Sequence, residues 1–198
     1  MPSPTGRGGR LSCVPMTTKA YAALLRGINV GGSKKVPMAR LRPLLEGLGL
    51  GGVRTYLQSG NATFTSDHGD EESLAAELSA AIEKEFGFAV DVIVRDHASL
   101  KSVVDACPFP ADTLEGKQLH VTYFSGPVTP GRFASVDPAA FAPEDFRLGP
   151  RELYLYAPEG LGRSKLAAQL SRPGLNKGLI ATSRNWNTVV KLVEMTGA

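Results

Sequence analysis

The sequence contains few of the residues that build metal and redox sites. Only two of its 198 residues are cysteines and three are histidines. Cys13 and Cys107 form no CxxC pair, and no histidine stands at metal-ligand spacing from a cysteine or from another histidine. The sequence therefore predicts neither a metal site nor a cofactor. Two cysteines without a disulfide framework are typical of a protein in the reducing cytoplasm.

Long apolar segments are also missing. No hydrophobic run approaches the roughly 18 residues that a membrane-spanning helix needs, so we expect no membrane association. The opening stretch, MPSPTGRGGRLSCVP, lacks the apolar region of a signal peptide and offers almost nothing to bury. We therefore predict that residues 1–15 form a disordered extension and that the protein is cytoplasmic.

The glycine-rich loop 24–37 shows no specific signature of nucleotide binding. It has no GxGxxG spacing and no GK[ST] motif, and no nucleophile–base pair can be identified in the chain. The segment GLGRSKL (160–166) lacks the Walker spacing, and a glycine turn followed by a helix cap at Ser164 explains it. No particular reaction is therefore indicated.

Positive charge is concentrated in the first third of the chain. The net charge is only +3, but residues 1–65 contain nine lysines and arginines against Glu46 alone. Residues 66–115 contain three against twelve acids, half of which belong to a predicted solvent-facing helix. The cations of the first segment instead cluster around one loop, which indicates an anionic partner.

The pattern of apolar residues predicts an α/β (α+β) fold of two similar halves. Residues 16–96 alternate in the order strand, helix, strand, strand, helix, strand. The clearest helix is 70–86, which has acids in its first turn and apolar residues at helical spacing. After a connecting helix, residues 97–198 repeat strand, helix, strand, strand, helix. We therefore predict two ferredoxin-like βαββα(β) halves, 16–96 and 97–198, and infer an internal duplication from the element order.

The stretch LLRGINVGGSKKVP (24–37) ends the first strand with glycines and cations. In a ferredoxin-like half, strands one and two are parallel, so this loop and the turn at 59–61 lie at one end of the sheet. The first helix begins there too, with free N–H groups. Glycines, free amides and cations together predict an anion site, although a simple turn with solvated lysines would leave the same pattern. The predicted ligand residues of the first half are Arg26, Gly27, Asn29, Gly31, Gly32, Ser33, Lys34, Lys35, Gln58, Ser59, Gly60 and Asn61.

The second half adds two polar residues to this prediction. TSRNWNT (182–188) precedes a helix, and Thr182, Ser183 or Asn185 is expected to cap it. Arg184 and Asn187 have no comparable structural explanation in the sequence. We therefore predict that Arg184 and Asn187 reach the anion site from the second half.

Several motifs together resemble one known family. LLRGINVGG followed by KVPM, then TYLQSGNATF, GRSKL and TSRNWNT, occur in that order between about Tyr21 and Leu192. They are similar to motifs of the bacterial domain-of-unknown-function family 1697. The resemblance implies a two-part α/β fold with ferredoxin-like features, but no activity. The motif positions that it singles out are Arg26, Gly27, Asn29, Gly60, Asn61, Arg184, Asn185 and Trp186.

Three functions stay open at this point. The first is binding of a phosphorylated or otherwise anionic small molecule at the loop 26–35. The second is nucleic-acid binding, which the basic first segment favours although aromatic residues make up only 7% of the chain. The third is an enzyme acting on a phosphorylated substrate, with Arg26, Lys34, Lys35 and Arg184 stabilising charge. The sequence does not indicate an oligomeric state.

Overall fold

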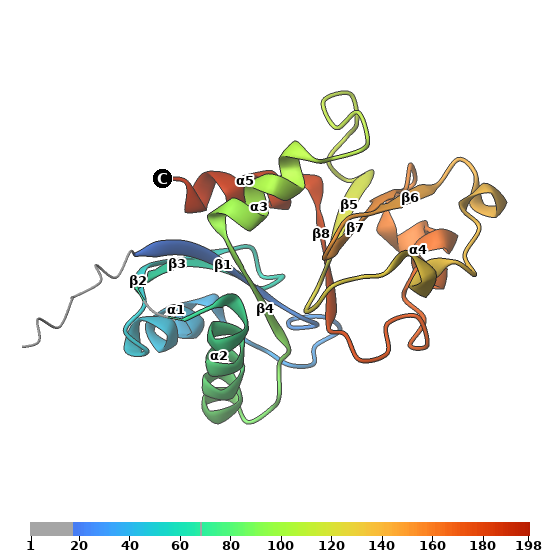
Figure 1. The fold of residues 1–198 in the computed structure, drawn as a ribbon. Coiled ribbons are helices and arrows are strands. Elements are labelled where there is room, and N and C mark those ends of the chain that lie inside the picture. The colour runs from blue at the N-terminus through green and yellow to red at the C-terminus, as the bar shows by residue number, and fades with distance from the viewer. Residues whose placement is uncertain (1–17, 68) are drawn as a thin grey trace, which may run out of the picture.

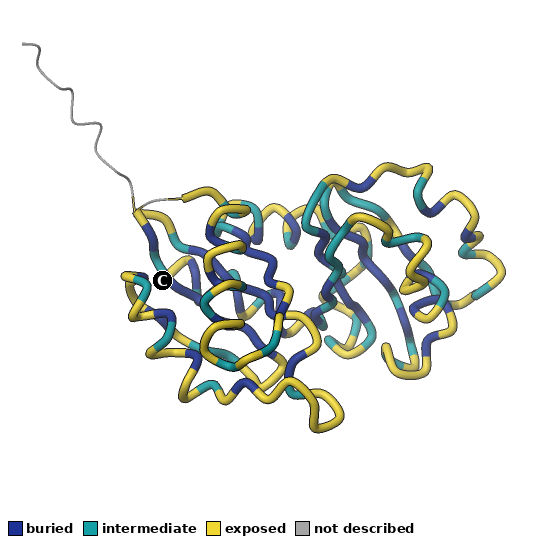
Figure 2. The backbone as a smooth tube through the Cα atoms, turned by 90° about the horizontal axis from the view of Figure 1, so that it is seen from below, coloured by how far each residue is buried: buried dark blue, intermediate teal, exposed yellow. Residues whose placement is uncertain are grey.

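The computed structural model describes residues 18–67 and 69–198, and these form two four-stranded antiparallel sheets (Figure 1). The predicted extension, residues 1–15, lies outside the described residues. Burial is concentrated along the strands and the inward faces of the helices, whereas the connecting loops are mostly exposed (Figure 2).

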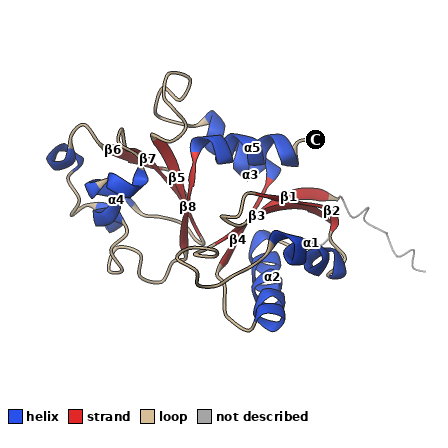
Figure 3. Cartoon of the chain, turned by 180° about the vertical axis from the view of Figure 1, so that it is seen from behind, coloured by secondary structure: helices blue, strands red, loops and turns tan. Residues whose placement is uncertain are grey.

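The first sheet has the strand order β2-β3-β1-β4. Its strand β3 is antiparallel to both β1 and β2, so β1 and β2 are parallel to each other, as predicted. Helices α1 and α2 cover one face of this sheet (Figure 3). The elements of the first half are β1 (Lys19–Leu25), α1 (Met38–Gly47), β2 (Gly51–Tyr56), β3 (Asn61–Ser66), α2 (Glu71–Phe86) and β4 (Val92–Asp96).

Local signals explain α2 completely. The Asp70 side chain accepts hydrogen bonds from the amides of Glu72 and Ser73 and so caps the helix, while Gly87 ends it with a φ of 79°. The buried stripe predicted from the sequence is present. It consists of Leu74, Leu78 and Ile82, and burying each of these side chains contributes roughly 1.5–3 kcal/mol.

The second sheet has the strand order β6-β7-β5-β8, which matches the first sheet element for element. Two 3-10 helices replace the first helix of the unit. The predicted α/β (α+β) fold with two ferredoxin-like halves is confirmed, and the equal element order is what an internal duplication predicts. The further elements are α3 (His97–Asp105), β5 (Leu119–Phe124), η1 (Pro130–Phe133), η2 (Pro138–Phe141), β6 (Asp145–Leu148), β7 (Glu152–Tyr156), η3 (Leu161–Arg163), α4 (Lys165–Leu170), β8 (Ala181–Asn185) and α5 (Trp186–Thr196).

One hydrophobic cluster belongs to both halves. Ala22 and Leu24 of β1 pack in it together with Tyr123 of β5 and Leu192 of α5. Helices α3 and α5 contact each other and cover the face of the first sheet opposite to α1 and α2 (Figure 3). The two sheets are therefore fixed relative to each other, although the division of the chain between 96 and 97 stays a prediction.

None of the helices in residues 18–67 and 69–198 has both the length and the apolar character that crossing a bilayer requires.

Candidate functional site

The glycine-rich loop 26–35 and the turn 58–61 lie in direct contact at one end of the first sheet. Asn29 Nδ2 donates a hydrogen bond to the Gln58 carbonyl over 2.8 Å, and the Leu25 amide donates to the Gly60 carbonyl over 2.9 Å. The shared position that the ferredoxin-like topology predicts for these two segments is therefore present.

Internal hydrogen bonds hold the loop in a compact conformation. Asn29 has a left-handed backbone, with a φ of 55°, and its side chain both donates to and accepts from the backbone of Val36. Lys34 also has a positive φ, and its Nζ donates to the Ala89 carbonyl over 2.8 Å. Asn29 and Lys34 therefore stabilise the loop itself, which reduces what they can offer to a ligand.

The far end of the loop borders an open surface depression of about 500 Å³. Gly32, Lys35 and Gln58 line it together with the first residues of α1. The residue before that helix is Pro37, which provides no side-chain cap. Lys34 and Lys35 are both exposed, and of the two it is Lys35 that borders the depression.

Arg184 is buried, with 7% of its surface exposed, and it joins the two halves. Each of the five N–H groups of a guanidinium has an acceptor here, because Nε donates once and Nη1 and Nη2 donate twice each. The acceptors are Asn61 Oδ1 (2.6 Å), Thr182 Oγ1 (2.8 Å) and the carbonyls of Ser183 (2.8 Å), Leu25 (2.8 Å) and Gly60 (3.1 Å).

All five acceptors of Arg184 are neutral oxygens. Burial lowers the pKa of Arg184 to about 10, while the nearby Tyr123 hydroxyl acts to raise it. The guanidinium therefore stays charged at neutral pH, and none of its bonded partners carries the opposite charge. Its hydrogen bonds are fully used, so it can act on a ligand through its charge rather than by donating to it.

The turn 58–61 is built to contact the second half. Asn61 is completely buried and donates to the Tyr56 carbonyl over 2.9 Å while it accepts from Arg184. Gly60 has a φ of 86°, and a Cβ at this position would lie 2.6 Å from Ile28 Cδ1. Only glycine fits there, so Gly60 lets the turn pack against Ile28 and Leu25 of the first half, while its carbonyl and Asn61 accept from Arg184 of the second half.

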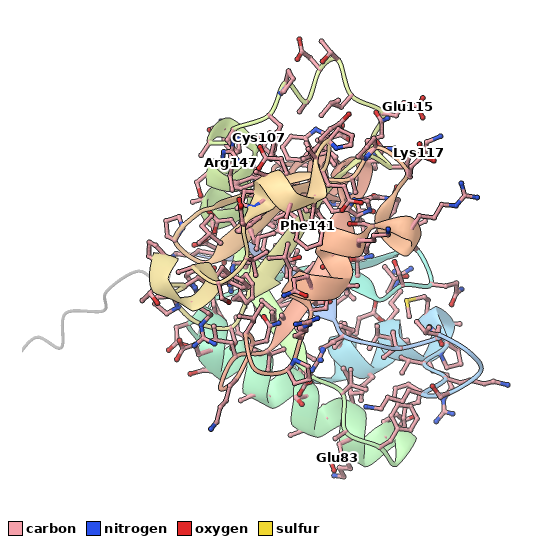
Figure 4. All side chains as sticks on the ribbon, turned by 90° about the vertical axis from the view of Figure 1, so that its right-hand side faces the viewer. Glu83, Cys107, Glu115, Lys117, Phe141 and Arg147 are labelled. Carbon is pink, nitrogen blue, oxygen red and sulfur yellow. The ribbon has the colours of Figure 1, made fainter. Side chains whose placement is uncertain are left out.

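Asn187 does not lie with these residues. Its exposed side chain lies against Gly116, where an added Cβ would overlap its amide. Glu115 and Lys117, on either side of Gly116, form an ion pair of 2.8 Å. In Figure 4 they lie at the opposite end of the molecule from Glu83 of α2. The structure thus brings Arg184, but not Asn187, to the loop and turn of the first half.

Sequence reasoning missed a pocket of about 350 Å³ beside this junction. Its wall is formed by the face of the second sheet that carries Phe124 and by residues of α4 and the segment after it. Arg26, from the loop of the first half, also lines the pocket and forms an exposed ion pair with Asp91 over 2.9 Å. The sole signal in the sequence was the polar Thr122 inside the apolar strand LHVTYF.

Comparisons with known proteins agree with the geometry of the fold. A family model described as a protein of unknown function, DUF1697, matches residues 18–154. The chain belongs to this family. The structure of the conserved bacterial protein SP0830 from Streptococcus pneumoniae superposes on this DUF1697 protein with a TM-score of 0.71. The match covers 91% of this chain and 99% of that one at 23% identity, so it shows a shared fold. Among curated proteins, none matches the sequence.

In this DUF1697 protein, the family match includes the loop 26–35 and the turn 58–61 but ends before β8. The predicted site residues have different surroundings. Gly60, Asn61 and Arg184 join the two halves, Asn29 and Lys34 hold the loop, Lys35 and Gln58 border the depression, and Arg26 lines the pocket. Within residues 18–67 and 69–198, no group of three His, Cys, Asp or Glu residues could hold a metal ion.

Proposed function

We propose that this protein binds a small anionic molecule where its two halves meet, with Arg26 contacting the anion. One observation carries the proposal: the buried Arg184 keeps its charge among five neutral oxygens, and Arg26, which follows one of its acceptors, the Leu25 carbonyl, lines an open pocket. A carboxylate or phosphate group in that pocket would be attracted by this uncompensated charge.

Arg26 is suited to the direct contact. It donates to Asp91 through Nη1, and its side chain is 53% exposed. Its remaining N–H groups have no acceptor among the described residues and can form charge-assisted hydrogen bonds, which contribute roughly 1.5–3 kcal/mol each when partly shielded from water. The ion pair with Asp91 holds the side chain in place at the pocket.

The geometry favours binding over acid–base catalysis. Among the described residues that line the pocket there is no carboxylate and no imidazole. A general base must lie within hydrogen-bond reach of the proton that it removes. The pocket residues therefore supply recognition groups, namely a guanidinium, hydroxyls and an amide.

A thermal-shift experiment tests the proposal. Carboxylates and phosphate monoesters are compared with their neutral amides and alcohols at constant ionic strength. Binding to the folded state raises the melting temperature by mass action, so we expect the anions to stabilise more than their neutral counterparts. Arg26→Ala should reduce this stabilisation.

Arg42→Ala provides a matched control. Arg42 forms an ion pair with Glu46 at the same distance of 2.9 Å, and its side chain is similarly exposed at 60%. It lies on α1 and does not line the pocket. If Arg26→Ala and Arg42→Ala have equal effects, or if no anion stabilises more than its neutral counterpart, the proposal is wrong.

Two further arms separate the alternatives. Replacing both Lys34 and Lys35 with alanine tests the far end of the loop, and we expect a smaller loss of binding than for Arg26→Ala. A larger loss would move the site to the depression and overturn the role of Arg26. Binding of single-stranded RNA that weakens steeply with salt, without a response to any small anion, would replace small-molecule binding by nucleic-acid binding.

A further inference from the structure

We infer that the pocket of the second half accepts a small amphipathic acid: a compact apolar body carrying one anionic group. This inference rests on the proposed function, which supplies the anionic group, and adds the chemical class of the rest of the molecule. Two features of the pocket carry it, an apolar wall and a polar end that lies at the junction with the first half.

The wall of the pocket is apolar and its members come from several elements. Phe124 of β5, Leu153 and Leu155 of β7, Phe133 of η1 and Leu170 of α4 line it. Each is buried, with 1–7% of its surface exposed. A volume of about 350 Å³ lies at the small end of the range for ligand pockets, so the apolar body must be compact.

The polar end contains a pair of hydroxyl groups. Thr122 Oγ1 and Ser183 Oγ lie 2.6 Å apart on the neighbouring strands β5 and β8, and both line the pocket. Each hydroxyl has one hydrogen to donate, and the bond between them uses only one of these hydrogens. The second hydrogen is therefore available to an acceptor atom of a ligand.

Arg184 places this hydroxyl pair next to the first half. Its Nη1 donates to the Ser183 carbonyl, and its Nη2 donates to the carbonyl of Leu25, the residue before Arg26. The spare hydroxyl hydrogen and the Arg26 guanidinium thus belong to the same end of the pocket, while the Arg184 side chain lies on the other face of β8. When the acid group of a ligand binds at this end, the apolar wall remains available to the rest of the ligand.

A polar metabolite fits this pocket poorly. The two other polar side chains in the lining already donate to the protein: Ser171 Oγ to the Ala167 carbonyl over 2.7 Å, and Asn176 Nδ2 to the Leu170 carbonyl over 2.8 Å. The hydroxyl groups of a sugar phosphate would lose water against Phe124 and its apolar neighbours without finding partners, which is unfavourable.

The test uses straight-chain alkanoates from butanoate to decanoate, the matching alkanols, and glucose 6-phosphate. Affinities for the full chain are measured by calorimetry or by ligand-observed NMR. We expect alkanoate affinity to rise by about fourfold per methylene until the pocket is filled. Arg26→Ala should lower alkanoate affinity about tenfold at every chain length, and the alkanols should bind much more weakly.

Two variants test the location. Ala181→Phe fills the pocket from β8 and should abolish alkanoate binding, whereas Ala168→Phe makes the same change on the exposed side of α4 and should not. Thr122→Val with Ser183→Ala removes both hydroxyls at nearly constant volume and should weaken binding. Circular dichroism and melting temperature establish that each variant is folded, and the chain-length series on the unaltered protein requires no variant.

The outcomes are distinguishable. If glucose 6-phosphate binds in an Arg26-dependent way and the affinity for alkanoates does not depend on chain length, the inference of an amphipathic ligand is wrong, while the proposal of anion binding stands. If alkanols bind as tightly as alkanoates, both anion recognition and this inference are wrong. Alkanoate binding that Ala181→Phe leaves unchanged in a folded protein places the apolar body elsewhere and also overturns the inference.

Discussion

Arg184 Nε donates to Asn61 Oδ1 over 2.6 Å, and both residues are buried. This hydrogen bond joins β8 of the second half to the start of β3 in the first. It connects two of the motifs that characterise the sequence, QSGN and RNW, although 123 positions separate the two residues. The motifs therefore encode one structural joint.

Arg184→Met should destabilise the protein by at least about 3 kcal/mol, because five acceptors lose the Arg184 donor and the buried ones among them cannot recover water. Urea unfolding measures the change. Arg42→Met, which removes an exposed ion pair, should change the free energy of unfolding by less than about 0.5 kcal/mol. Equal effects of the two substitutions would contradict the role of Arg184 in joining the two halves.

Gly60→Ala should cost roughly 2–5 kcal/mol, since the added methyl group combines a left-handed backbone with overlap against Ile28 and Leu25. Gly87→Ala is the matched control. Gly87 has a similar φ of 79° but nothing within 4 Å of an added Cβ, so the backbone cost of about 1–2 kcal/mol remains alone. If Gly60→Ala and Gly87→Ala lower the free energy of unfolding equally in thermal unfolding, the turn accommodates the added methyl group without a packing cost.

Stability should fall as the pH drops below about 6.5 because of His120. Its ring is buried, its Nδ1 has no hydrogen-bond partner among the described residues, and burial lowers its pKa from the usual 6.5. The folded state therefore binds a proton less readily than the unfolded state, and the stability present above pH 6.5 is lost as the pH falls from there towards the lowered folded-state pKa. His120→Phe should reduce the dependence of the unfolding free energy on pH between pH 7.5 and 5.5. If the slope is unchanged, groups other than His120 cause the pH dependence.

Glu71→Ala should destabilise the protein by about 3 kcal/mol. The Glu71 carboxylate bridges the halves, because Oε2 lies 2.7 Å from Arg151 and 3.4 Å from the buried Arg95. Removing it leaves a buried cation without its counter-charge. Glu72→Ala, one residue further along α2 on the exposed side, should have little effect in the same unfolding assay.

Prediction from sequence worked where the signals are local. The α2 helix has its cap, its apolar stripe and its terminal glycine within 18 residues, so its bounds were predicted to within one residue. The strand β8 was missed because ATSRN is polar. Its inward residues, Thr182 and Arg184, are buried only because partners far away in the sequence satisfy their hydrogen bonds.

The candidate site was predictable only in its first half. Strand topology alone places the loop 26–35 beside the turn 58–61, whereas the packing of two halves decides what Arg184 and Asn187 can reach. The pocket depends on side chains from β5, β7, η1 and α4, whose association no short-range pattern encodes. For this reason the apolar part of the ligand site could not be foreseen.

The position of α5 has a consequence for biosynthesis. This helix packs against β1 and β3, and Leu192 joins the cluster that contains Ala22 and Leu24. While the chain emerges from the ribosome, the first sheet is therefore complete long before α5 has been made. Until then the apolar side chains that α5 covers stay exposed, and this is the surface that a nascent-chain chaperone would protect.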